Sequence, residues 1–319
     1  MSIDKNRVIV ILVLILLGTL LYYIQNLNNK QTNATSVARK ETIEKGALFS
    51  DKYMESSPFV WKGKLYYLIS DRNDAEKKHS LVIYDHEKKE KISPHFGDQL
   101  SLASAFVEGD TLYIYGTKDW TEFGKSEVFE IKTKNLKDFT GPRSVFKANE
   151  SMRFFNTSVT KDEDNGVYVM ALETDEKDRT PFSIRFLRSW TLDEWQMDEY
   201  AVYGNDTYVA CPTIRHLDGT YYLLLGDEHF YDPNCPDCKQ YITRIAKSTD
   251  LMTWETSAIP FLLPDPDGSE GLSAADVDLA EYEGKTIIHY SISDQSTWGD
   301  LKTATFDGSM KELFSLFFQ

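Results

Sequence analysis

Two acids that stand two residues apart, Asp276 and Asp278, open the stretch of the chain with the densest potential chemistry, residues 271–298. In an extended strand these two side chains point to the same face. A turn at residues 283–285 and a run rich in aromatic and β-branched residues follow, and then a second polar pair, Asp294-Gln295. Two strand ends therefore bring acids to one edge of a hairpin. Crowded acids of this kind can supply one protonated and one ionised carboxyl group for acid/base chemistry.

The same hairpin recurs four more times upstream, with fewer acids. Each copy has a strand-like run, a tight turn with a glycine, and a second run rich in aromatic and aliphatic residues. The turn glycines are Gly63, Gly109, Gly166, Gly219 and Gly284. Glycine supplies the positive φ angle that tight hairpins need. Successive turn glycines are about 46 to 65 residues apart, which is the length of one four-stranded sheet per repeat.

A third strand-like run follows each hairpin. These runs are residues 80–85, 128–132, 182–189, 241–248 and 301–306. Similar signals that contain Leu and Trp follow two of them, at residues 190–195 and 248–254, and residues 135–139 form a weaker echo. Repeats of this kind are typical of propeller blades. The sequence predicts an all-β fold, a five-bladed β-propeller over residues 46–319, with one short helix over residues 310–318.

The N-terminal residues form a separate segment. Two basic residues, Lys5 and Arg7, precede seventeen nearly continuous apolar residues, 8–24. This run is at the short limit for a membrane span but exceeds a usual signal-peptide core, and a small-x-small site appears only at residues 36–38. We expect a signal anchor with a single N-terminal transmembrane helix over residues 1–25 and a flexible tether over residues 26–45. The propeller would then lie outside the cytoplasm, or be secreted if the segment is cleaved.

Composition and cysteine usage exclude several classes of protein. The net charge of -15 argues against nucleic-acid binding, because a phosphate-binding surface needs clustered Lys and Arg. The pair Cys235 and Cys238 lacks a second pair or spaced histidines, so a small disulfide is favoured over a zinc site. Cys211 is expected to be a small core residue. Residues 265–270 lack the ligand spacing of a calcium loop. The sequence predicts no cofactor and no metal site.

The chain resembles the five-bladed propeller glycosidases, the superfamily that contains glycoside hydrolase families 32, 43, 62, 68 and 117. The hairpin pattern, the Ser-x-Asp-Leu-x-x-Trp blade endings and the five-fold count carry the resemblance over residues 50–319. A closer similarity, to a bacterial subgroup, lies in residues 156–159, 210–215 and 273–295. The resemblance implies hydrolysis of glycosidic bonds and a carbohydrate partner.

The chain departs from the pattern that family 43 enzymes share. Those enzymes have an Asp before a Pro in the first blade as the base, a pKa-tuning Asp in the second blade and an acid Glu in the third. The nearest positions here hold Ser57-Pro58, Ala103-Ser104 and Asn156-Thr157, and the fourth blade has Cys211-Pro212. Only the fifth blade is expected to open with an acid, Asp276. If the chain is a glycosidase, its catalytic carboxylates lie at other positions than those of family 43 enzymes.

The catalytic candidates are acids at the ends of inner-hairpin strands, because those strands face the central channel of a propeller. They are Glu173, Asp227, Glu228 and Asp276. Glu173 follows an apolar strand, and the Asp227-Glu228 pair is expected at the matching place in the fourth blade. Glycoside hydrolysis needs one protonated and one ionised carboxyl group. As an alternative, Asp276 and Asp278 could hold backbone N–H groups and have a structural role.

The substrate-binding candidates surround these acids. They are Asp278, Asp294, Gln295, Arg185, Arg215, His229 and Trp298. The two arginines could orient a sugar group or form salt bridges with the acids. Aromatic residues on expected mouth loops, Trp298 among them, could stack on sugar faces or pack between blades. His289 stands in the middle of a strand and is expected to be a core histidine.

Two functional hypotheses follow from these residues. The first is a membrane-anchored, extracytoplasmic glycoside hydrolase that cleaves oligo- or polysaccharides by carboxylate acid/base catalysis. The alternative is a non-catalytic carbohydrate-binding or cell-surface scaffold propeller, which the missing first-blade Asp favours. The expected partners are a carbohydrate and, through the N-terminal helix, a membrane.

Overall fold

The computed structural model describes residues 43–51, 53, 55–73, 78–118, 121–179, 182–205, 207–230, 239–294 and 299–318. Residues 44–319 form one compact unit. The predicted transmembrane helix, most of the predicted tether and the Cys235–Cys238 pair lie outside the described residues. Among those that are described, none belongs to a helix of the length and apolar character that a membrane crossing requires.

The described residues form twenty strands and one helix. The first blade consists of β2 (Ser56–Trp61), β3 (Lys64–Asn73), β4 (Lys78–Asp85) and β5 (Glu90–Lys91). The second consists of β6 (Ser101–Glu108), β7 (Thr111–Thr117), β8 (Glu127–Thr133) and β9 (Thr140–Lys147). The third consists of β10 (Met152–Asp162), β11 (Val167–Glu176), β12 (Ser183–Ser189) and β13 (Gln196–Tyr203).

The last two blades complete the set. The fourth consists of β14 (Val209–Leu217), β15 (Thr220–Phe230), β16 (Lys239–Ser248) and β17 (Glu255–Thr256). The fifth consists of β18 (Ser273–Tyr282), β19 (Lys285–Ser293), β20 (Asp300–Phe306) and β1 (Glu44–Ser50). A single parallel pair, Tyr241 with Ser273, joins the fourth and fifth sheets.

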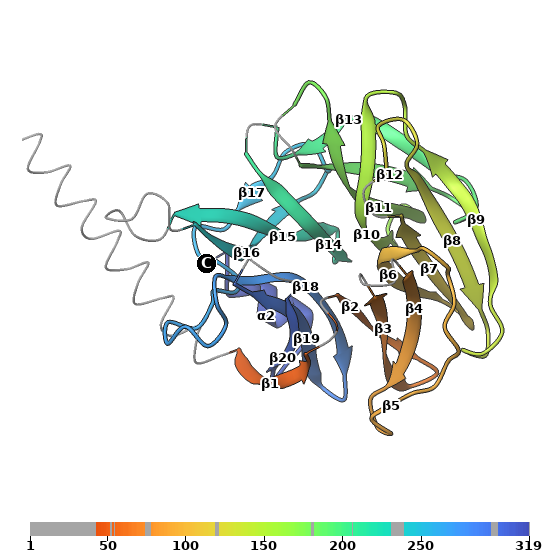
Figure 1. Ribbon diagram of the computed structural model, residues 1–319. Helices are drawn as coiled ribbons and strands as arrows, with labels where there is room; N and C mark the ends of the chain where they lie inside the picture. Colours follow the sequence, from red (N-terminus) through yellow and green to blue (C-terminus); the bar gives the residue numbers. More distant parts are fainter. Residues whose placement is uncertain are drawn as a thin grey trace, which may run out of the picture. The chain divides into compact units, whose positions relative to one another are not determined.

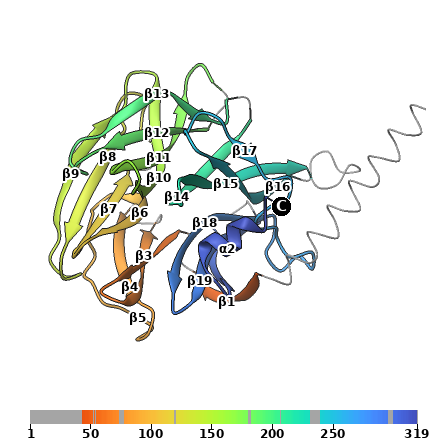
Figure 2. The same cartoon turned by 180° about the vertical axis from the view of Figure 1, so that it is seen from behind.

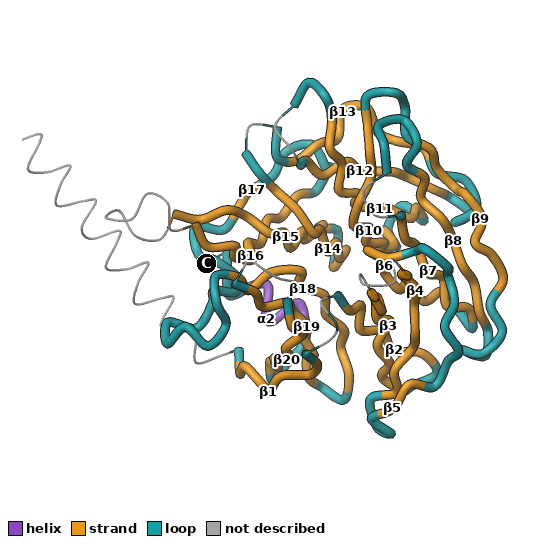
Figure 3. The backbone as a smooth tube through the Cα atoms, in the orientation of Figure 1, coloured by secondary structure: helices purple, strands orange, loops and turns teal. Residues whose placement is uncertain are grey.

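The five inner strands form a closed ring. Each of β2, β6, β10, β14 and β18 contacts the next inner strand, and β18 contacts β2. Figure 1 shows these strands around the centre of the domain, and Figure 3 shows the other strands of each blade leading outward from them. The all-β, five-bladed propeller that the sequence predicts is therefore confirmed.

The repeated sequence signals have local structural causes. Three hairpin turns, Lys62-Gly63, Asp218-Gly219 and Glu283-Gly284, have positive φ at both central residues, which matches the twist of the paired strands. In the blade endings, Leu192 and Leu251 also have positive φ and are buried. The Ser189 and Ser248 hydroxyls accept hydrogen bonds from the N–H groups of these leucines, each at 3.0 Å.

Apolar side chains fill the spaces between neighbouring blades. Val169 and Phe186 of the third blade, for example, pack in one buried cluster with Leu223 of the fourth. Successive side chains of a strand point to opposite faces of its sheet. In the second strand of each blade they therefore point alternately to the preceding blade and to the following blade. This alternation decides which acids can meet at the axis.

The fifth blade takes its outermost strand from the start of the domain. β1 begins at Glu44 and pairs with β20, so the first strand in the chain closes the last blade. The buried carboxylate of Glu270 accepts hydrogen bonds from Lys45 of β1, from Lys302 of β20 at 2.7 Å and from the Tyr290 hydroxyl of β19 at 2.7 Å. One carboxylate therefore holds three strands of the closing blade.

The predicted C-terminal helix is present as α2 (Met310–Ser315) and ends three residues earlier than expected (Figure 2). Ser309 and Glu312 form a capping box at its start. Phe314 packs against Tyr222 with ring centroids 5.1 Å apart, and Phe317 packs against Phe261 at the same distance. Aromatic packing therefore fixes the C-terminal residues on the fourth blade.

Candidate active site

Five equivalent residues at the beginnings of the inner strands surround the centre of the propeller. The strand pairing defines the equivalence. In each blade the residue stands two positions before the inner-strand residue that pairs with one residue of the second strand, which is Leu68, Tyr115, Ala171, Leu224 or His289. They are Glu55, Leu102, Asn156, Cys211 and Asp276. Four of them, with neighbouring residues of all five blades, line a cavity of about 30 Å³. A cavity of this size has room for about two water molecules.

A β-bulge aims several of these side chains. In β6, β14 and β18 the register shifts by one residue at this level. Leu102, Cys211 and Asp276, which lie in these bulges, have φ of 53°, 50° and 51°. A left-handed backbone costs a non-glycine residue on the order of 1 kcal/mol, and such strain concentrates at functional sites.

Glu173 lies on the second strand of the third blade, and the equivalent positions on the second strands of the other four blades hold no carboxyl group. It is the seventh residue after its hairpin turn, and the seventh residues of the other blades are Ser70, Thr117, Gly226 and Ser291. Its side chain faces the fourth blade, where the Cys211 N–H donates a hydrogen bond to Glu173 Oε2 at 2.7 Å. The residue is only 4% exposed.

The environment of Glu173 favours its protonated form. Burial raises the pKa of Glu173 to about 8, although the hydrogen bond from Cys211 opposes this shift, and the negative charges of Asp276 and Glu55 raise the pKa further. The carboxyl group is therefore mostly neutral at pH 7 and can donate a proton. The structure thus brings together two of the four predicted catalytic residues, Glu173 and Asp276.

The other two predicted catalytic residues, Asp227 and Glu228, do not occupy the position in the fourth blade that is equivalent to Glu173 in the third. The apolar run of β15 extends through Leu225 to Gly226, so the acids come one and two residues beyond the equivalent position. Asp227 forms an ion pair with Arg244 of β16. Glu228 accepts a hydrogen bond from the Tyr241 hydroxyl at 3.4 Å. The expectation of a matching place in the fourth blade was wrong.

Glu55 is an acid that the sequence analysis missed. It directly precedes β2, is 8% exposed and lies at the level of Asp276, so the fifth blade is not the only one that opens with an acid. The spacing in the sequence could have identified Glu55, because Glu55 stands two residues before Ser57 as Asp276 stands two residues before Asp278. The Ser57-Pro58 pair, which aligns with the first-blade Asp-Pro of family 43 enzymes, lies inside β2, so the acid stands outside that motif.

Cys211 connects the two carboxyl groups of the site. Its backbone N–H donates a hydrogen bond to Glu173, and the charge of Asp276 acts on its thiol. Burial raises the pKa of the Cys211 thiol well above its ordinary value, and the charges of Asp276 and Glu173 add to this effect. The expected core residue is instead a half-buried residue at the axis that stays protonated. Asp276 also accepts a hydrogen bond from the Ser291 hydroxyl.

Three of the predicted substrate-binding residues, Asp278, Arg185 and Arg215, form salt bridges. For the two arginines, salt bridges were the alternative to a contact with sugar. Asp278 Oδ1 accepts a hydrogen bond from Arg215 Nη2 at 2.5 Å, which ties the fifth blade to the fourth. Arg185 Nε and Nη2 lie 2.7 and 2.9 Å from the two carboxylate oxygens of Glu176, and both residues are buried. Although burial opposes it, this pairing lowers the pKa of Glu176.

Glu55, Glu173, Cys211 and Asp276 form the axial group, and the remaining predicted residues do not belong to it. Asp294 is exposed at the end of β19. Gln295, Trp298 and the side chain of His229 lie outside the described part of the chain. His289 is buried as expected, with Nδ1 3.0 Å from the Ser56 hydroxyl, and burial lowers its pKa to about 3.

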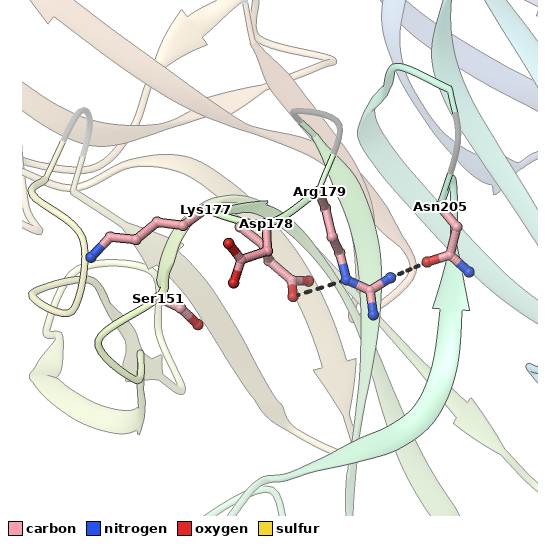
Figure 4. A pocket seen from close by; sticks show the side chains of 6 residues that line it. Ser151, Lys177, Asp178, Arg179 and Asn205 are labelled. Atoms are coloured by element: carbon pink, nitrogen blue, oxygen red, sulfur yellow. Dashed lines mark hydrogen bonds and ion pairs between the residues drawn. The ribbon is translucent and has the colours of Figure 1, made fainter.

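A larger cavity of about 560 Å³ lies beside the end of β11. It is lined by Ser151, Glu176, Lys177, Asp178, Arg179 and Asn205. Figure 4 shows Arg179 pointing toward the amide of Asn205, with which it forms a hydrogen bond. Arg179 also forms an ion pair with Glu176 at 3.3 Å. Its size is in the range of small-ligand sites, and its lining offers hydrogen-bond donors and acceptors of both charges.

A chain of aromatic rings, which the sequence analysis did not identify, links the third and fourth blades near Glu173. Phe155 and Phe182 have ring centroids 5.0 Å apart, Phe182 and Tyr208 are 5.5 Å apart, and Tyr208 and Tyr241 are 6.0 Å apart. Burial raises the pKa of Tyr208, and the charges of Cys211 and Glu173 add to the shift, so this ring lies near the axial acids. Such rings can stack on the apolar faces of sugars.

Solved structures of glycoside hydrolases share this arrangement of blades. A xylan β-1,4-xylosidase from Bacillus halodurans has a TM-score of 0.59 at 13% identity, over 82% of this chain and 54% of that chain. A glycosyl hydrolase from Bacteroides ovatus has 0.57 at 12%, over 82% and 85%. An exo-1,5-α-L-arabinanase from a bovine ruminal metagenomic library has 0.56 at 10%, over 81% and 94%.

At these identities the similarity establishes the fold. The chain has the five-bladed propeller fold of glycoside hydrolase structures, as the resemblance in its sequence implied. No protein-family model matches the chain, and no curated protein matches it in sequence.

Proposed function

We propose that this protein is a membrane-anchored, extracytoplasmic glycoside hydrolase. The observation that carries the proposal is Glu173, a buried carboxyl group with a pKa of about 8 that interacts with Asp276 and Glu55 at the axis of the propeller. A carboxylic acid held neutral near pH 7 is what protonation of a glycosidic oxygen requires. The glycoside hydrolases with the same fold support carbohydrate as the substrate class.

The axial residues divide the acid and base roles. Glu173 donates its proton to the leaving oxygen. Asp276, oriented by the Ser291 hydroxyl, accepts a proton from the attacking water. The negative charge of Glu55 helps to keep the proton on Glu173. The sugar approaches along the partly exposed rings of Phe182, Tyr208 and Tyr241, and the axial cavity holds water.

The membrane anchor rests on the sequence pattern of residues 8–24. In cells that express the full chain, the protein should sediment with membranes and resist extraction by alkaline carbonate. Protease added outside the cytoplasmic membrane should digest the propeller. Recovery in the soluble fraction, or protection from that protease, would refute the anchor or its orientation.

The catalytic proposal is tested with a panel of oligo- and polysaccharides and the purified full chain. Products are detected as reducing ends and by mass spectrometry. Glu173→Gln and Asp276→Asn should lower turnover by roughly a hundredfold or more, because each removes a proton-transfer group. Asp227→Asn is the control, since Asp227 is paired with Arg244 and does not line the axial cavity. Unchanged turnover in Glu173→Gln would exclude Glu173 as the acid.

The burial of Glu173 favours a second candidate, a non-catalytic carbohydrate-binding propeller. The axial cavity of about 30 Å³ is too small for a sugar ring, so a glycan would contact only the aromatic rings above it. In that case the panel would yield no product, while glycan binding would persist in Glu173→Gln and weaken in Tyr208→Ala.

A further inference from the structure

A second group of polar side chains lies at the end of the inner strands opposite the axial acids. Asp162 ends β10, Asp164 follows in the hairpin turn, and His216 lies on β14 of the next blade. Asp162 is about 17 Å along the strand from Thr157, which lines the axial cavity. One ligand atom from each of the three residues lies within 4.8 Å of the other two.

His216 places its ring beside the Asp162 carboxylate. The side chain is only 5% exposed, and Nε2 lies 3.8 Å from Asp162 Oδ1, too far for a hydrogen bond. Within the described residues the ring makes no hydrogen bond. The ring is held in place by Tyr221, at a centroid distance of 4.5 Å, and by the backbone N–H of His216, which donates to Thr160 Oγ1 at 2.9 Å. The Asp162 carboxylate is the ion-pair partner of the ring only at 3.8 Å, a separation that one metal ion bound to both atoms would bridge.

Asp162 is fixed in an orientation suited to a ligand. Its Oδ2 accepts hydrogen bonds from the Tyr221 hydroxyl at 2.5 Å and from Asn165 Nδ2 at 2.9 Å. Its Oδ1 accepts the Asn165 N–H at 3.0 Å and keeps a lone pair on the side of His216. Although burial opposes it, these bonds lower the pKa of Asp162. Outer hydrogen bonds of this kind typically orient the ligands of protein metal sites.

Asp164 supplies the second charge of the group. Its side chain is exposed in the turn and forms no ion pair within the described residues, whereas its neighbour Glu163 pairs with Lys161 at 3.2 Å. The next hairpin turn approaches closely, since a Cβ atom added to Gly219 would lie 3.4 Å from Asp164 Oδ2. The third and fourth blades therefore bring this carboxylate and His216 together.

We infer that Asp162, Asp164 and His216 bind one divalent transition-metal ion of the Zn²⁺ type. Two carboxylates neutralise the charge of such an ion, and a set of one imidazole and two carboxylates suits Zn²⁺ better than Ca²⁺ or Mg²⁺, which prefer oxygen ligands throughout. The ion links the third blade to the fourth, and the remaining coordination positions are open to water. The site is independent of the proposed catalytic function.

Metal titration of the purified full chain tests this inference. The chain carries Cys235→Ser and Cys238→Ser, so that those thiols cannot bind the metal, and no affinity tag. Calorimetric titration with Zn²⁺ should show one site per chain, and Co²⁺ should give a visible absorption band at the same stoichiometry. Ca²⁺ should not compete for the site.

Three variants locate the site. Asp164→Asn and His216→Gln should each weaken Zn²⁺ binding by about tenfold or more, because loss of even an outer hydrogen-bond partner has an effect of that size. Glu163→Gln, in the same turn, should bind as the parent does. Asp164 is exposed, so its variant should fold even if His216→Gln does not, which circular dichroism of the metal-free proteins would show. Absence of Zn²⁺ binding, equal binding by all variants, or displacement by Ca²⁺ would overturn the inference.

Discussion

The backbone N–H of Cys211 lies 2.7 Å from Oε2 of Glu173, so the fourth blade contacts the buried carboxyl group of the third blade directly. The charge of Asp276 in the fifth blade raises the pKa of the thiol of the same cysteine, after the larger effect of burial. One residue thus couples the two acids that acid/base chemistry would use. The coupling has consequences for both stability and activity.

Glu173 should make the stability of the protein fall as the pH rises. Its pKa is about 8 in the folded protein and near 4.5 in the unfolded chain, so the folded state holds the proton more tightly. The resulting stabilisation is fully present below pH 4.5 and is lost as the pH rises through about 8. We expect the melting temperature of the wild type to decline from pH 5 to pH 9.

The variant Glu173→Gln isolates this effect, because it keeps the shape of the side chain and removes the titration. Its melting temperature should exceed that of the wild type by several degrees at pH 9 and approach it at pH 5. Asp227→Asn serves as the control and should keep the decline of the wild type. A parallel decline in Glu173→Gln would show that another group is responsible.

Glu55 should set the alkaline limit of activity if Glu173 is the general acid. The rate should fall as the pH rises above about 8, where Glu173 loses its proton. Glu55→Gln removes a negative charge that raises the pKa of Glu173, so the alkaline limb of kcat/KM should move to lower pH. An unshifted limb, with reduced kcat at all pH values, would instead make Glu55 a direct participant.

The buried pair of Arg185 and Glu176 should be essential for stability. Both side chains are less than a tenth exposed, so Arg185→Met removes the buried partner of the Glu176 carboxylate and leaves only the more exposed Arg179, at 3.3 Å, as its ion-pair partner. Breaking a buried ion pair in this way typically costs about 3–5 kcal/mol. Urea unfolding should show a loss of that size, whereas Lys64→Met, which breaks the exposed pair of Lys64 with Glu87, should leave the midpoint unchanged. Equal midpoints for wild type and Arg185→Met would contradict this view of the pair.

Glu270 should control closure of the propeller. Although burial opposes it, hydrogen bonds from Lys302 and Lys45 lower the pKa of Glu270 below its ordinary value of 4.5. The stabilisation is therefore present above pH 4.5 and is lost as the pH falls through the folded-state pKa. Glu270→Gln should lower the melting temperature at pH 7 and have a smaller effect at pH 3, provided the fold persists there. Hydrogen exchange at pH 7 should show faster exchange in β1 and β20 of the variant, and unchanged exchange there would argue against this role.

The sequence determined the architecture because its signals are local. The left-handed turns at Lys62-Gly63 and Glu283-Gly284, and the alternating apolar residues of each strand, depend on near neighbours along the chain. Five such units can bury their apolar faces only against one another, which leads to a closed ring. Glu173 and Asp276 could be identified as candidates from the same patterns, because each lies at an expected strand end.

The tertiary structure decided which side chains meet. The bulges that aim Cys211 and Asp276, the partnership of Arg185 with Glu176, and the position of Glu55 depend on strand register and on contacts between blades. The group of Asp162, Asp164 and His216 is likewise formed across two blades. A shift of one residue reverses the face of a side chain, as Gly226 and Asp227 show, and a sequence pattern does not resolve so small a shift. The local sequence signals therefore determined the fold, while the packing of blade against blade determined the buried environment that raises the pKa of Glu173.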